Sequence, residues 1–282
     1  MAGKWAARWL MALCAATLIF EVPAAGQTVM APAQDGATLR ARLAPVLDPP
    51  GRAMPVDAAA LDAMIQRHAF LALGDRLMGG KDMTTIDHDL NWMQARLFQG
   101  GGFFVGFAYM RALWQLAGAM PEAQSAGLKQ NAAAIYLYDL GLTAVDGPRC
   151  ADPSAPEHRR DQLLQTDRAI LDYLRGLPLA DRMRIGTIAV SIEAATASVR
   201  GDDYVLCSGG LDQIAAGLKA NGKKSLPQVP GAPGRVGKTY AVPPPPDYTP
   251  RFVPVAVAAP KQAVARRELP VMLTRLLAPA AP

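Results

Sequence analysis

The chain has 282 residues, 51% of them hydrophobic, which is enough for one domain to bury its own core. Its excess of basic residues lies in the tail, where residues 223–282 carry nine basic and two acidic side chains, while residues 27–222 carry 18 basic and 21 acidic ones. The basic overall composition therefore gives no argument for binding nucleic acid, and we expect no nucleic-acid partner.

Residues 1–26 have the features of a secretory signal peptide in their usual order. Lys4 and Arg8 come first, and the apolar run from Trp9 to Phe20 is shorter than the roughly 20 residues that span a bilayer. Small residues at Ala24, Ala25 and Gly26 then provide a cleavage site. We expect a periplasmic or secreted protein without a transmembrane span in the mature chain; an uncleaved signal anchor is the alternative.

The predicted export determines how we interpret the cysteines. Cys14 lies inside the signal, so the exported chain keeps Cys150 and Cys207. In an oxidising compartment two cysteines allow a single intramolecular pairing, and we predict a Cys150–Cys207 disulfide. Buried free thiols, or two ligands of a metal site, are the alternatives.

The part of the chain after the signal is predicted to be helical. A loose lead-in over 27–55 contains one short helix near 38–47, and a single-domain, all-α bundle of about seven helices occupies 56–222. His68 falls on the apolar side of the first helix, where we expect a core histidine hydrogen-bonded to a neighbouring helix; a catalytic or ligand-binding role is the alternative. The helices are expected at about 57–79, 84–99, 102–120, 121–146, 154–176, 178–200 and 208–222.

The most apolar helix begins after three consecutive glycines, Gly100 to Gly102. Glycine costs close to 1 kcal/mol relative to alanine inside a helix, so we expect a hinge there rather than one long rod. Gly102 and Gly106 have a spacing that lets a second helix backbone approach closely. Arg111 argues against a membrane span, because a charge near the middle of a span costs at least ~2.5 kcal/mol. We therefore predict a central buried helix in which Arg111 reaches an acid or the surface.

The tail, residues 223–282, is rich in proline and basic residues and is predicted to be largely disordered. Thirteen prolines fall between Pro227 and Pro282. An apolar cluster at 269–277 lies among three arginines. It could dock on the helical domain, contact a membrane surface or bind a partner.

No motif with a known catalytic mechanism is present, and we expect no cofactor. We expect no metal site either, since Asp87, His88 and Asp89 are consecutive helical residues that point about 100° apart and cannot converge on one ion. The best candidate site is a polar corner after the fourth long helix, which could position a polar ligand, supply an acid and a base, or simply form an ion-pair network. Its members are Asp139, Asp146, Arg149, Asp152, Glu157, His158, Arg159 and Arg160.

Two functional hypotheses remain. The first is a non-catalytic exported protein that binds a protein or another component of the cell envelope. The second is an envelope hydrolase or lytic enzyme that uses an acid of the polar corner, Asp139 or Asp146. The binding hypothesis agrees with the absence of a catalytic motif. The enzyme hypothesis requires that Asp139 or Asp146 lines an open cleft.

Overall fold

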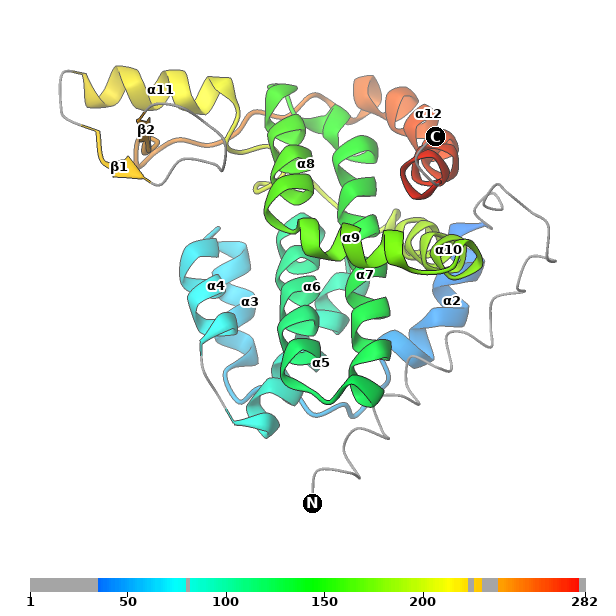
Figure 1. Ribbon diagram of the computed structural model, residues 1–282. Helices are drawn as coiled ribbons and strands as arrows, with labels where there is room; N and C mark the ends of the chain where they lie inside the picture. Colours follow the sequence, from blue (N-terminus) through cyan, green and yellow to red (C-terminus); the bar gives the residue numbers. More distant parts are fainter. Residues whose placement is uncertain (1–34, 80–81, 223–225, 230–237, 279–282) are drawn as a thin grey trace.

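The computed structural model describes residues 35–79, 82–222, 226–229 and 238–278, which are mostly helical (Figure 1). The predicted signal peptide lies outside these residues. The all-α class is confirmed, with eleven α-helices in the described part of the chain and a two-stranded antiparallel sheet, in which Gln228 pairs with Tyr240 and Val229 with Thr239. The elements are α2 (Gly36–Leu47), α3 (Ala58–Gln66), α4 (Phe70–Met78), α5 (Met83–Phe98), α6 (Gly102–Ala119), α7 (Glu122–Val145), η1 (Gly147–Arg149), α8 (Ser154–Thr166), α9 (Arg168–Gly176), α10 (Leu179–Thr196), α11 (Leu211–Asn221), β1 (Gln228–Val229), β2 (Thr239–Tyr240) and α12 (Val255–Leu277).

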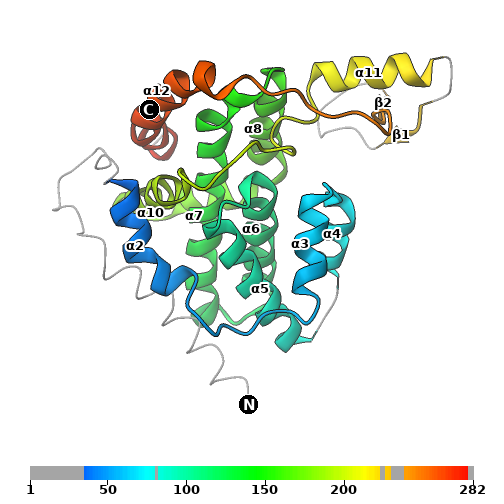
Figure 2. The ribbon, with the colours of Figure 1, turned by 180° about the vertical axis from the view of Figure 1, so that it is seen from behind.

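Helices α6 and α7 lie side by side at the centre of the molecule in both views (Figures 1 and 2). Helices α3 and α4 lie on one side of this pair, and α2, α10 and α12 lie on the other. The two central helices approach closely at Gly106, where a Cβ atom would collide with the carboxylate of Asp139. The close approach predicted from the glycine spacing is therefore present, and α6 is the central packing helix.

The glycines before α6 form the predicted hinge. Gly100 and Gly102 have φ angles of 95° and 73°, which glycine adopts without the steric penalty of a side chain. Farther along α6, the half-exposed Arg111 places its Nε 3.9 Å from a carboxylate oxygen of Asp167. No helix in the described part of the chain is long and apolar enough to cross a membrane.

The helix expected over 57–79 is two helices in the structure, and His68 lies in the turn between them. Helix α3 ends at Gln66, and His68 follows with a φ of 57°. The amide of Ala69 donates to the carbonyl of Met64 and the amide of His68 donates to that of Ile65, the Schellman pattern that ends a helix. His68 is consequently exposed, and its assignment to the core was wrong.

A second break, at Asp167, separates α8 from α9 within the helix expected over 154–176. Together with α2 and α12, the two breaks explain why the described residues contain eleven α-helices rather than seven. Apolar periodicity does not reveal either break, because it continues across a single turn that bends the chain.

Helix α12 corrects the prediction of a largely disordered tail. It spans 23 residues of that segment and packs against α7 and α10. Leu269, Leu273 and Leu277 recur at helical spacing and are buried, and Leu269 contacts the helix backbone at Gly141. The apolar cluster noted in the sequence therefore docks on the helical domain.

A buried ion network joins α12 to the same two helices. Glu193, at 0% exposure, places a carboxylate oxygen 2.6 Å from Arg200 and 3.0 Å from Arg266 of α12. The guanidinium of Arg200 in turn lies 2.7 Å from Asp146 at the end of α7. Opposite charges in contact offset the desolvation that each buried group would suffer alone.

Candidate functional site

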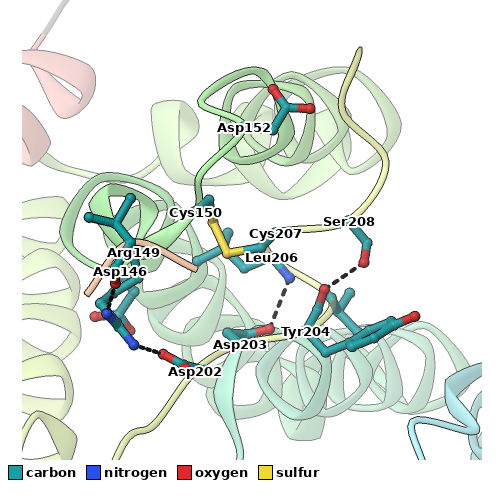
Figure 3. Close-up of a disulfide and its surroundings, with 12 residues drawn as sticks. Asp146, Arg149, Cys150, Asp152, Asp202, Asp203, Tyr204, Leu206, Cys207 and Ser208 are labelled. Carbon is teal, nitrogen blue, oxygen red and sulfur yellow. Dashed lines mark hydrogen bonds and ion pairs between the residues drawn. A yellow bond between two sulfur atoms is a disulfide. The ribbon is translucent and has the colours of Figure 1, made fainter. Parts of the chain in front are cut away.

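Asp146 and Arg149 of the polar corner each form an ion pair with a residue of the loop after α10. Asp146 pairs with Arg200, and Arg149 contacts the carbonyl of Val253. Arg149 also pairs with the carboxylate of Asp202 (Figure 3). These contacts connect the end of α7 to the loop after α10 and to the segment that leads into α12. Both charges are thus used to hold chain segments together.

The members of the corner on and before α8 also fasten loops. Nδ1 of the exposed His158 donates to the carbonyl oxygen of Gly209 at 3.0 Å. Asp152 accepts from the amides of Ser154 and Asp212, at 3.0 and 2.9 Å. These bonds attach the start of α8 to the start of α11. Glu157 and Arg160 are exposed on the same helix.

Asp139 is separated from the rest of the corner. Its side chain is fully buried between α7 and α6, and neither carboxylate oxygen has a hydrogen-bond partner among the described residues. Burial, and then the nearby charges of Asp203 and Asp167, raise the pKa of Asp139 well above its ordinary value. A substrate would reach this carboxyl only if the two central helices separated.

Asp89 is also buried, and it pairs with Arg76 at 2.9 Å. Within the described residues no group of three or more metal-ligating side chains converges on one point.

An open pocket of about 450 Å³ lies between the α3–α4 hairpin, α6, α8 and the loop that follows α10. This size falls within the range of small-molecule sites in proteins. Arg159 is the one member of the predicted polar corner that lines it. The pocket is lined by His68, Phe70, Leu71, Gly74, Asp75, Phe103, Phe104, Phe107, Arg159, Gln162, Tyr204, Val205 and Ser208.

Six of the thirteen residues that line the pocket carry aromatic rings, and several of these rings pack on one another. His68 stacks on Tyr204 with 4.2 Å between ring centroids, and Phe70 lies 4.9 Å from Phe104. The Schellman turn after α3 puts the exposed His68 ring at this position, while Phe103 and Phe107 come from successive turns of α6. Such a wall buries a flat apolar group without leaving polar atoms unpaired.

The disulfide between Cys150 and Cys207 holds the loop that forms one side of the pocket. The bond is present as predicted, with the two Cα atoms 5.0 Å apart (Figure 3). In the same loop, Asp203 accepts a hydrogen bond from the amide of Leu206 at 2.9 Å. It also accepts one from the amide of Phe103, in the first turn of α6, at 2.5 Å. Tyr204 is held at its far end, where its hydroxyl donates to the carbonyl of Tyr248. The ring of Tyr204 is thus fixed before any ligand arrives.

Arg159 brings a positive charge to this apolar surface. Its Nε donates to the carbonyl of Val205 and its Nη1 to the side chain of Gln162, both at 3.0 Å. No carboxylate within the described ranges forms a salt bridge with it. Burial lowers the pKa of the guanidinium from its ordinary value, and the charge of Asp203 opposes this shift. The side chain remains charged, because arginine is not deprotonated in proteins at ordinary pH.

Sequence reasoning found Arg159 and missed the rest of the pocket. The aromatic residues at 103–107 belong to a strongly apolar helix, a pattern that by itself indicates core packing rather than a pocket wall. His68 and Phe70 lie far from Tyr204 in the sequence, and only the turn after α3 and the disulfide loop bring the three rings together.

Comparison of the chain with protein-family models, with curated proteins and with solved structures found no match.

Proposed function

We propose that the protein is an exported, non-catalytic binding protein of the cell envelope that holds a small ligand in the aromatic pocket. The observation that supports this proposal most is an open pocket whose aromatic wall is ordered by stacking and by a disulfide. A preformed site saves the entropy of ordering side chains on binding. The disulfide also supports export, because such bonds persist in oxidising compartments.

The polar groups of the pocket favour binding over catalysis. The hydroxyl of Ser208 donates to the carbonyl of Tyr204 at 2.7 Å. In the part of the chain that the structure describes, the ring of His68 forms no hydrogen bond with an acid or a nucleophile. A nucleophile activated by a base requires that contact.

The alternative is a hydrolase that uses Asp139 or Asp146. It has less support, because Asp139 is fully buried and Asp146 is paired with Arg200. Loss of an envelope-lytic activity in an Asp139→Asn or Asp146→Asn variant that still folds would favour it over the binding function.

Gly74 offers a direct test of the pocket. A Cβ at this position would lie 3.7 Å from the ring of Phe104, an ordinary contact, so a larger side chain extends into the pocket without displacing backbone. We expect the neutral fluorescent probe N-phenylnaphthylamine to bind the native protein saturably. Gly74→Leu should weaken this binding at least tenfold, since it displaces ligand area worth about 25 cal/mol per Å².

The matched control is Gly118→Leu, which also replaces a helical glycine by leucine. A Cβ at Gly118 meets no atom within 4 Å, and this residue does not line the pocket. Equal loss of probe binding in both variants, or no saturable binding by the native protein, would contradict the proposed function.

A further inference from the structure

The charge inside the pocket points to the kind of ligand that it accepts. A guanidinium group has five N–H donors, and Nε and Nη1 of Arg159 each donate once to neighbouring protein groups. Neither of these acceptors, the carbonyl of Val205 and the amide of Gln162, carries a charge. The positive charge of Arg159 therefore lacks a direct ionic partner within the described residues.

Asp203, the acid whose charge acts on Arg159, is not available to supply that partner. Both oxygens of Asp203 accept backbone hydrogen bonds, from Phe103 and Leu206. Burial also raises the pKa of Asp203, which works against full ionisation of its carboxyl group. Asp203 consequently compensates Arg159 only in part and from a distance.

The acid that lines the pocket, Asp75, is exposed on α4. Two unit charges 4 Å apart interact by about 1 kcal/mol in water but by about 4 kcal/mol in the partly desolvated surroundings of a protein surface. The partly buried Arg159 therefore has more influence on a bound ligand than Asp75 has. This difference disfavours a cationic ligand, although aromatic walls alone would suit one.

We infer that the ligand is an organic anion with a flat, apolar or aromatic body, whose carboxylate is bound by Arg159 while its body lies against Phe70, Phe104 and Tyr204. This inference rests on the proposed binding function and specifies the ligand class of the same pocket. A carboxylate accepts the paired, coplanar donors of arginine in a geometry that a neutral amide does not match.

The test compares naphthoate with naphthamide, which have the same ring system and differ in charge. We expect isothermal titration calorimetry at neutral pH to show that the native protein binds naphthoate at least tenfold more tightly. Arg159→Gln should abolish this preference and leave the affinity for naphthamide within about threefold of native, while Arg159→Lys should keep part of the preference. Arg160→Gln is the matched control, because Arg160 is the next residue of α8 and is exposed.

Three outcomes would overturn the inference: equal affinity of the native protein for both compounds, a preference that survives Arg159→Gln, or a preference that Arg160→Gln removes as well. Circular dichroism would show whether each variant folds. If Arg159→Gln does not fold, Arg159→Lys still tests whether the geometry of the Arg159 charge sets the preference for naphthoate. If N-phenylnaphthylamine still binds in the pocket, these outcomes refute the anionic ligand and leave the binding function standing. Failure of all three compounds to bind would refute both.

Discussion

Asp139 is predicted to make the protein less stable as the pH rises. The carboxyl group lies between α7 and α6 against Gly106, at 0% exposure and without a hydrogen-bond partner among the described residues. Burial raises its pKa well above the ordinary value of 3.8, so the folded protein keeps a proton that the unfolded chain releases. We expect the Asp139→Asn variant, which removes this titration, to be more stable at neutral pH.

The sign and the size of this change in the free energy of unfolding follow from proton linkage. Below pH 3.8 the carboxyl is protonated in both states, and its protonation has no effect on stability. Above that pH only the unfolded chain ionises, so the free energy of unfolding falls by about 1.4 kcal/mol per pH unit until the pH reaches the folded pKa. The Asp139→Asn variant should therefore gain about 1–3 kcal/mol over the native protein at pH 6.

Urea unfolding followed by circular dichroism between pH 4.5 and 7.5 measures this difference. Asp167 and Asp203 also have raised pKa values, but they titrate in both proteins, so subtraction isolates Asp139. Asp172→Asn is the control, because that exposed acid lies 3.4 Å from Arg168 at the surface. The prediction is contradicted if Asp139→Asn is less stable than the native protein and its free energy of unfolding changes with pH in the same way. That result would show that Asp139 is ionised and has a partner in the folded protein.

Two further predictions concern the bonds that hold the fold and the pocket. Replacing Cys150 and Cys207 by serine opens a cross-link of 57 residues and should lower the free energy of unfolding by about 4 kcal/mol. Naphthoate binding should also weaken, and an unchanged affinity would show that the disulfide does not position the pocket loop. Glu193→Ala should lower the free energy of unfolding, measured with urea, by about 3–5 kcal/mol. The substitution removes the buried carboxylate that pairs with both Arg200 and Arg266. Asp212→Ala, at an exposed pair, should cost under about 1 kcal/mol, and equal losses would contradict a special role for the buried network.

Local features of the sequence were enough to predict several parts of this structure. Apolar periodicity indicated the helical class, and Gly100 and Gly102 marked the hinge because a helix interior disfavours glycine. The pairing of Cys150 with Cys207 followed from counting, since the chain after the predicted signal peptide has no other cysteine. Arg111 was predicted to reach an acid or the surface, and it lies half-exposed near Asp167.

The candidate site was harder to predict from the same features. Asp146, Arg149 and His158 were grouped because they are close in sequence, and in the structure each contacts a different residue of the loop between α10 and α11: Arg200, Asp202 and Gly209. Their prediction as ligand-binding residues stays a prediction, since nothing in the structure tests it. Of the wider corner, only Arg159 lines the pocket, because its helix turns that position toward α6 and the disulfide loop.

The sequence by itself determined the helical class, the hinge and the disulfide, because each depends on neighbouring residues or on a simple count. Only the tertiary structure decided the aromatic pocket, the position of His68 and the docking of α12. His68 faces Tyr204 because the chain turns after α3, and residues this far apart meet through packing that no local pattern encodes. The tail helix is ordered because Leu269, Leu273 and Leu277 are covered by α7 and α10, a surface that exists only once those helices have packed.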